Sequence, residues 1–494
     1  MIKISKDIVR QQKNFWNNCI FHPTDAIEDP WGKRILDRCA KDKAIQTVRI
    51  YAMFEDIVYE DENGGIAYDF RVSDLRLDYL VEKGYDILIA YGMIPKILAE
   101  NPEITSTVNK GKTRYKGKML YPSRVKDLKV WEDICYEYTK HIVERYGVET
   151  VAKWHIHCYN EPDIRSFLLP DIPWEYNDLK ALEYLKLYEG FVKGVLRCTD
   201  KLNMGGPALG SDLKFLEVFL NGVKEKNLRL DYISMHNYAG IWPLSMTEDV
   251  GFNVDCWIEH MNPRIELIRK LGFGDKEILY DEWGMCPSGF YNVEEAPMLI
   301  ERETEVFSSY FVRLIERIIK SDVELSKIMI CLSGQHEMVV DFSGFRNFFT
   351  LNFFAKPIYN AYVLAAKLYE GLLSVDNGNE NIYTIPTKNE NGDLAVLLTY
   401  TSKRHDERSV PDITEKLHFD EDIKGRKVTL WCIDKDTTNP YNLYKKMGKP
   451  EMDADVIKAL REEGNIKPIK EFIADGDIEL KLTANCVYLV EIKA

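Results

Sequence analysis

The stretch KWHIHCYNEP, residues 153–162, decides the fold class of this chain. Its first seven residues, 153–159, predict a β-strand that ends abruptly at Asn160, Glu161 and Pro162. Pro162 has no backbone N–H and disfavours helical geometry in the residue before it, so we expect Glu161 to be extended. Its carboxylate would then lie at the C-terminal end of the strand, where a (β/α)8 barrel places its chemistry.

Seven other short β-rich runs alternate with helical stretches up to about residue 355. Eight such runs separated by helices predict an α/β fold, a (β/α)8 TIM barrel with its helices outside. The predicted strands are 15–20, 46–51, 86–91, 153–159, 203–206, 231–235, 277–280 and 327–332.

Two of the intervening segments carry an apolar stripe with helical period, which we interpret as core packing. The stripes are Leu182, Leu185, Tyr188, Phe191, Val192 and Val195, and then Phe307, Phe311, Leu314 and Ile318.

The pattern changes after residue 356. One helix is expected at 358–370, followed by short apolar runs separated by turn signals, which predict a C-terminal antiparallel β-sandwich. The domain prediction is an N-terminal segment 1–14 packing on the sandwich, a catalytic barrel 15–356 and a sandwich domain 357–494. The predicted sandwich strands are 382–385, 394–400, 427–433, 478–482 and 487–492.

Composition excludes several classes of protein. A net charge of -14 argues against a nucleic-acid partner, because phosphate binding requires clustered Lys and Arg. The N-terminus has no signal-like apolar segment, and no run of about 18 apolar residues predicts a membrane span. Ten cysteines are scattered singly, which indicates reduced, mostly buried thiols and a cytoplasmic location.

A second carboxylate ends another predicted strand. Residues 277–280 lead into Asp281, Glu282 and Trp283, so Glu282 also lies at a strand end, beside an aromatic ring suited to a sugar. On our count the two glutamates follow strands 4 and 7, which a closed barrel brings across from each other. Retaining glycoside hydrolysis uses two carboxylates about 5–5.5 Å apart, one as acid/base and one as nucleophile.

Other chemistries are disfavoured. His155 and His157 resemble zinc ligands, but strand alternation places Cys158 on the opposite face. The sequence has no phosphate-binding glycine loop and no Gly-x-Ser-x-Gly nucleophile elbow. We expect no metal and no cofactor.

The chain resembles glycoside hydrolase family 39 of clan A over most of its length. In that clan the acid/base follows an Asn on strand 4 and the nucleophile ends strand 7. Beyond the two glutamates, the resemblance rests on VRIYAMF (48–54), YDF (68–70), DYLVEKG (78–84), GMIPKILA (92–99), GGPA (205–208), DYISMHNY (231–238) and KMGKP (446–450).

The resemblance implies roles for individual residues. Glu161 would be the general acid/base and Glu282 the nucleophile. Asn160 would contact the sugar 2-hydroxyl, and Tyr238 would hydrogen-bond the nucleophile and keep it ionised. The resemblance also implies that Arg49 supports the nucleophile electrostatically and that His236 lines the pocket between the two carboxylates.

Two positions depart from the family pattern in the region that selects the sugar. Tyr51 replaces the usual strand 2 His, and residues 331–337, CLSGQHE, lack the usual strand 8 Trp. We therefore expect the reaction type to carry over better than the substrate. Tyr51, Trp283 and Glu337 complete the predicted substrate-binding set.

The resemblance predicts a β-xylosidase-like retaining glycosidase that cleaves small oligosaccharides or other glycosides. The same mechanism on an arabinose-, uronate- or hexose-containing substrate is the alternative, and a non-catalytic carbohydrate-binding protein is a further one. A basic loop, residues 110–118, could recruit an anionic substrate. Because family members are often oligomeric, a homo-oligomer is favoured.

Overall fold

The computed structural model describes residues 1–494 apart from 22–26, 107–119, 239–251, 287–290 and 334–337. Within these residues, eight parallel strands form a closed barrel in the order β10-β11-β2-β3-β6-β7-β8-β9. This confirms the predicted barrel, and each of the eight predicted runs overlaps one barrel strand. The strands are β2 (Asn18–Phe21), β3 (Thr47–Met53), β6 (Asp86–Gly92), β7 (His155–Cys158), β8 (Asn203–Leu209), β9 (Tyr232–Tyr238), β10 (Glu277–Gly284) and β11 (Lys327–Leu332).

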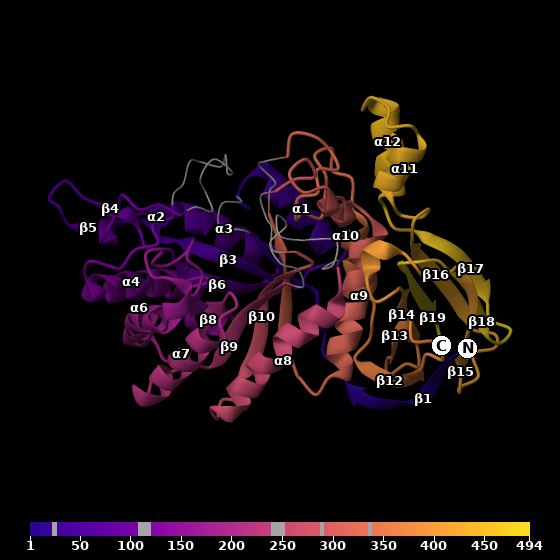
Figure 1. Ribbon diagram of the computed structural model, residues 1–494, viewed down its shortest axis with the longest axis horizontal. Helices are drawn as coiled ribbons and strands as arrows, with labels where there is room; N and C mark the ends of the chain where they lie inside the picture. Colours follow the sequence, from indigo (N-terminus) through magenta and orange to yellow (C-terminus); the bar gives the residue numbers. More distant parts are fainter. Residues whose placement is uncertain (22–26, 107–119, 239–251, 287–290, 334–337) are drawn as a thin grey trace.

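Helices cover the outside of the barrel (Figure 1). The major ones are α1 (Pro30–Lys41), α3 (Arg71–Glu82), α4 (Leu128–Tyr146), α6 (Asn177–Cys198), α7 (Leu213–Glu225), α8 (Val254–Lys270), α9 (Glu305–Lys320) and α10 (Pro357–Ala365). Shorter elements are α2 (Phe54–Ile57), α5 (Val148–Val151) and a hairpin of β4 (Val58–Glu60) and β5 (Ile66–Tyr68).

The predicted apolar stripes are buried with one exception. The α9 stripe and five of the six α6 residues lie in the core, whereas Leu182 is 48% exposed. Steps of three residues drift around a helix of 3.6 residues per turn, so the first residue of the run falls at the edge of the buried face.

The C-terminal part and the N-terminal strand together form a single nine-stranded sheet, mostly antiparallel, in the order β17-β16-β19-β14-β13-β12-β1-β15-β18. Sequence patterning identified five of these strands and missed β1, β12, β15 and β17. The nine are β1 (Ile2–Gln11), β12 (Gly371–Asp376), β13 (Ile382–Lys388), β14 (Leu394–Tyr400), β15 (Ile413–Phe419), β16 (Lys427–Ile433), β17 (Pro468–Ile473), β18 (Ile478–Leu482) and β19 (Cys486–Ile492).

The sheet curls around its own apolar core. One buried cluster contains residues from both halves of the strand order. Ile4 of β1 and Leu480 of β18 belong to it, and so do Val396 of β14 and Val490 of β19. The N-terminal strand β1 is part of this sheet, antiparallel to β12 and parallel to β15. Figure 1 shows its indigo ribbon among the orange and yellow strands.

Helix α9 lies between the barrel and the sheet (Figure 1). It contacts β13, β14 and β19, and Leu397 and Leu489 join the barrel's core cluster. A hydrogen bond of 2.8 Å joins the hydroxyls of Ser309 and Thr399 across this contact. Two further helices, α11 (Pro440–Lys446) and α12 (Ala454–Glu463), project from the sheet.

All ten cysteines lie in the described part of the chain, none of them forms a disulfide, and eight are buried. Among the described residues, no helix combines the length and the apolar composition that crossing a membrane requires.

Candidate active site

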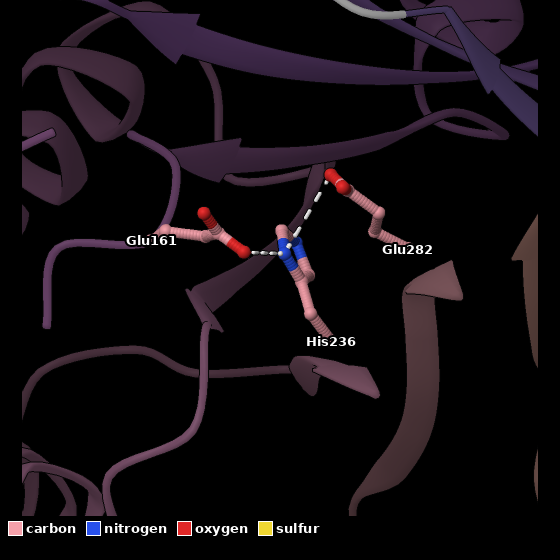
Figure 2. Close-up of side chains that lie close together, drawn as sticks. All are labelled: Glu161, His236 and Glu282. Carbon is pink, nitrogen blue, oxygen red and sulfur yellow. Dashed lines mark hydrogen bonds and ion pairs between the residues drawn. The ribbon is translucent and has the colours of Figure 1, made fainter. Parts of the chain in front are cut away.

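Two glutamates meet at the C-terminal ends of β7 and β10. Glu161 follows β7, and Glu282 lies near the end of β10. Figure 2 shows both carboxylates reaching toward the imidazole of His236 on β9. One carboxylate oxygen of Glu161, one of Glu282 and a ring nitrogen of His236 lie within 4.8 Å of one another. The barrel therefore brings together two residues 121 positions apart, by subtraction of their numbers.

The backbone at Glu161 is not extended, contrary to the expectation drawn from Pro162. Its φ is +43°, and that of Tyr159 is +69°, both in the left-handed region. Such geometry costs about 1–3 kcal/mol for a non-glycine residue and persists where neighbouring contacts hold it. Here the Glu161 N–H donates to the carbonyl of Ala208 on β8 at 2.9 Å. Tertiary hydrogen bonding therefore overrides the local preference set by proline.

Asp163 fixes the loop that carries Glu161. Its buried carboxylate accepts backbone N–H bonds from Gly210 and Ser211, both at 2.7 Å, and from Asp212 at 3.0 Å. These three residues lie between β8 and α7. The loop after β7 is thus anchored to the loop after β8, two residues beyond the candidate acid/base.

An irregularity in β10 turns two consecutive carboxylates toward the barrel interior. The pairing of β10 with β9 shifts register between Tyr280 and Glu282. The pairing of β10 with β11 shifts register between Tyr280 and Trp283. A β-bulge of this kind breaks the alternation of side chains. Asp281 and Glu282 consequently both contact Arg49, at 3.1 and 3.5 Å.

Glu282 is surrounded by donors and cations. Its Oε1 accepts a hydrogen bond from the Tyr238 hydroxyl and lies 3.8 Å from Nη1 of Arg346. Its Oε2 lies 3.5 Å from Arg49 and 3.6 Å from His236. Burial raises the pKa of Glu282, but His236, Arg346, Arg49 and the Tyr238 hydrogen bond together outweigh burial and lower that pKa below its usual value. The carboxylate is therefore held ionised, as a nucleophile requires.

The surroundings of Glu161 shift its pKa in the opposite direction. Burial raises its pKa, and the negative charge of Glu282 adds to that effect, while His236 opposes it. The Nδ1 atom of His236 lies 2.7 Å from Oε1 of Glu161. Two carboxylates with pKa values shifted in opposite directions are the arrangement that acid/base and nucleophile roles need.

Asn160 is oriented by two donors. Its side-chain oxygen accepts hydrogen bonds from Nη2 of Arg49 at 2.6 Å and from the hydroxyl of Tyr51 at 2.8 Å. With its oxygen engaged in this way, the amide nitrogen is the group that can donate to a ligand. Arg49 and Tyr51 thus lie in the same network as the two glutamates.

Two of the predicted substrate-binding residues are not placed with this group. Trp283 is fully buried and packs against α9, its ring 5.8 Å from that of Phe311 at an interplanar angle of 11°. It lies on the outer face of β10, and this position corrects the expectation that it contacts a sugar. Glu337 lies outside the described residues, as does the basic loop 110–118.

Sequence reasoning missed two residues of the site, Asp281 and Arg346. Alternation around Glu282 would place Asp281 outside the barrel, and only the bulge brings it in. Arg346 lies in the segment after β11, where no periodic pattern marks it. Its Nη1 donates to the Tyr238 hydroxyl at 2.5 Å, and its Nε donates to Ser333 at 3.1 Å.

The spacing of Glu161, His236 and Glu282 would let three ligand atoms converge on a cation. The guanidinium groups of Arg49 and Arg346 beside Glu282 oppose such an ion, because they already neutralise the carboxylates. The geometry fits acid/base and nucleophilic chemistry better than metal binding.

Residues 1–479 match the family model described as glycosyl hydrolases family 39. The chain belongs to this family. Family 39 membership makes it a glycoside hydrolase that acts with retention of configuration.

Named relatives agree with this family 39 assignment. Over 488 residues the chain is 24% identical to a β-xylosidase of Caldicellulosiruptor saccharolyticus, spanning 92% of this chain and 89% of that protein. Over 250 residues it is 25% identical to an α-L-iduronidase of Canis lupus familiaris, spanning 46% of this chain and 34% of that protein. The solved structure of a monomeric β-xylosidase from Caulobacter crescentus CB15 superposes with a TM-score of 0.81 at 18% identity, covering 100% of this chain and 99% of that one.

Proposed function

We propose that this family 39 enzyme removes terminal sugars from small oligosaccharides by double displacement, with Glu161 as general acid/base and Glu282 as nucleophile. One observation carries the proposal. Two carboxylates with oppositely shifted pKa values, one just after β7 and one on β10, each place an oxygen within 4.8 Å of the other. This spacing suits attack by one carboxylate on the sugar and leaves no room for a water between them, as retention requires.

In the first step, Glu282 attacks the anomeric carbon while Glu161 protonates the departing glycosidic oxygen. An ester between the sugar and Glu282 results. The ionised Glu161 then removes a proton from water as the water attacks the same carbon and releases Glu282. Tyr238, Arg49 and Arg346 stabilise the carboxylate that leaves in this second step.

Asn160 would read the sugar 2-hydroxyl in this scheme. Arg49 and Tyr51 fix its oxygen, so the amide nitrogen is presented in one orientation. A hydrogen bond to the 2-hydroxyl strengthens as positive charge develops at the neighbouring anomeric carbon. His236 would line the pocket between the two glutamates.

A β-xyloside is the first substrate to test, because the relatives aligned over most of the chain are named β-xylosidases. Residue 51 is a Tyr whose hydroxyl is engaged by Asn160, and the cation Arg346 lies beside the nucleophile. These two features leave an arabinose-, uronate- or hexose-directed activity as the alternative. A panel of aryl glycosides of xylose, arabinose, glucose, galactose and glucuronate decides between them by kcat/KM.

The domain assignment belongs to the same proposal. Residues 15–356 would form the catalytic unit, and the nine-stranded sheet, which includes β1, would be an accessory domain. We also propose that the enzyme acts in the cytoplasm as a homo-oligomer. A carbohydrate-binding protein without activity would not require two oppositely tuned carboxylates.

Glu282→Ala should abolish turnover of every glycoside in the panel. Added azide should restore reaction of an activated aryl glycoside and give a glycosyl azide of inverted configuration, because azide would occupy the space of the missing carboxylate. Glu277→Gln, on the same strand but at its other end, is the control and should keep activity. Turnover by Glu282→Ala without azide would refute the assignment.

A further inference from the structure

Asp281 is a buried carboxylate that the double displacement does not use. It is fully buried, and its Oδ2 lies 3.1 Å from Nε of Arg49 and 3.3 Å from Nε2 of His157. Its Oδ1 lies 3.6 Å from Nε2 of His236. A buried charge is costly unless neighbouring charges compensate it. The position of Asp281 next to Glu282 in sequence and beside His236 therefore requires an explanation.

His236 connects Asp281 to the candidate acid/base. Its ring is fully buried, with Nδ1 2.7 Å from Glu161 on one edge and Nε2 facing Asp281 on the other. Its backbone carbonyl accepts a hydrogen bond of 2.6 Å from Arg264 of α8, which fixes this end of β9. An imidazole ring with one carboxylate at each edge can direct an N–H toward both of them only when both ring nitrogens carry protons.

Counting charges shows how many protons the site holds. Arg49 and Arg346 are cations, and Asp281 and Glu282 balance them as anions. Glu161 and His236 together must then carry one exchangeable proton for the buried site to be neutral. His157 does not change this count, because burial lowers its pKa well below the usual value and keeps it uncharged.

The reaction preserves this balance. When Glu282 forms the ester it loses its negative charge, and in the same step the Glu161–His236 pair gives up its proton to the leaving oxygen. When water opens the ester, the pair regains the proton and Glu282 regains its charge. The site remains neutral in both states, so no net charge is buried at any stage.

We propose that Asp281 is a positioning residue that acts through His236, holding the shared proton on the imidazole until Glu161 passes it to the leaving oxygen. In the resting enzyme His236 is doubly protonated. As the glycosidic bond breaks, the proton on Nδ1 moves to Oε1 of Glu161 and on to the departing oxygen. Deglycosylation returns a proton from water by the reverse path. This inference rests on the proposed roles of Glu161 and Glu282.

The pKa of His236 shifts in the direction that this geometry implies, whereas burial raises the pKa of Asp281 against the opposing charges of Arg49 and His236. Burial lowers the pKa of His236, but Glu282, Glu161 and Asp281 outweigh it and raise that pKa. The groups facing the His236–Asp281 pair are Glu161 after β7, His157 on β7, Arg49 on β3, Glu282 on β10, Tyr232 on β9 and, through the backbone carbonyl of His236, Arg264 on α8.

Asp281→Asn tests the proposal, because it keeps the shape of the side chain and removes its charge. The Glu161–His236 pair should then lose its proton at lower pH, so the basic limb of kcat/KM should move down by about one pH unit. The substrate is an aryl glycoside with a poor leaving group, which needs the acid. A basic limb that stays in place while activity falls would overturn the proposal.

Glu277→Gln is a matched control. Glu277 is a carboxylate on the same strand, 3.1 Å from Nε2 of His155, yet it lies at the other end of β10. Its loss removes a charge beside a histidine without touching the site. The basic limb should not move, and an equal shift in this variant would show that any lost carboxylate produces the effect.

The wild-type enzyme provides a test that does not depend on folding of the variant. Histidine labelled with ¹⁵N distinguishes an imidazolium from a neutral ring, and His236→Gln identifies the signal. The proposal requires His236 to be an imidazolium at pH 7; a neutral ring there would overturn it. Azide rescue of Glu282→Ala together with a neutral His236 would refute this inference alone, whereas failure of that rescue would refute the proposed function.

Discussion

At the scale of single residues, Tyr238 links the proposed nucleophile Glu282 to the cation Arg346. Its hydroxyl donates to Oε1 of Glu282 and accepts from Nη1 of Arg346. The hydroxyl therefore relays the positive charge of Arg346 toward the carboxylate. Hydrogen bonds to a charged group contribute about 1.5–3 kcal/mol, which corresponds to a shift of one or more pKa units.

Tyr238→Phe should move the acidic limb of kcat/KM to higher pH. Activity requires ionised Glu282, and the Tyr238 hydrogen bond helps to lower its pKa. Removing the donor raises that pKa, so the carboxylate becomes protonated at a higher pH, by about one unit. The pH profile of an aryl glycoside measures the shift.

The control for this prediction is Tyr146→Phe. Tyr146 also donates to a carboxylate, Asp78, at 2.8 Å, but on the outside of the barrel. Its pH profile should match the wild type. If the acidic limb does not move in Tyr238→Phe, the Tyr238 hydroxyl does not lower the pKa of Glu282.

At the scale of elements, two irregular segments of backbone create the site. One is the left-handed turn at Glu161, and the other is the register shift in β10. Regular strands would place one inward side chain in every two residues, and neither segment follows this rule. The turn depends on Asp163, whose carboxylate accepts three backbone N–H groups from the segment between β8 and α7.

Asp163→Asn should lower both stability and activity. The amide loses one acceptor oxygen, so at least one backbone N–H between β8 and α7 loses its partner, at a cost of about 1–3 kcal/mol of unfolding free energy. Because Glu161 lies two residues away, kcat for poor leaving groups should fall more than kcat for activated ones. Thermal unfolding and the two rates measure these effects.

Asp453→Asn is the comparison for this loop. Asp453 also accepts two backbone N–H bonds, at 3.0 and 2.9 Å, but at the start of α12. The Asp453→Asn substitution should reduce stability without changing kcat. Equal loss of kcat for both leaving groups in Asp163→Asn would contradict a role in placing the acid/base.

At the scale of the whole molecule, the first strand of the chain belongs to the last part of the fold. Strand β1 lies between β12 and β15, and Ile4 pairs with Val375 on one side and Phe419 on the other. Ile4 is fully buried in the core of the nine-stranded sheet. The two ends of the chain therefore cannot fold independently.

Ile4→Ala should reduce the free energy of unfolding by about 2–5 kcal/mol through the cavity it leaves. Val9→Ala, on the same strand but 57% exposed, should change it by about 0.5 kcal/mol or less. Chemical denaturation measures both, and kcat of the folded enzyme should be unchanged in each. Equal stability of the two variants would show that β1 is not needed for the sheet.

Much of this architecture followed from local pattern. Each barrel strand overlaps a run of β-forming residues, and both glutamates stand where such a run ends. The missed strands have weaker patterns. In β17, burial is slight along the whole strand, and β1 becomes recognisable only when paired with β12 and β15, segments far away in sequence.

The sequence by itself determined the barrel, the family and the two glutamates, because strand periodicity and strand-end motifs are local properties. The tertiary structure alone decided which neighbours complete the site. The bulge in β10 brings Asp281 inward, packing on α9 places Trp283 outside, and closure of the barrel next to the segment after β11 brings Arg346 to Glu282. Register and closure depend on contacts between distant segments, and no local pattern encodes them.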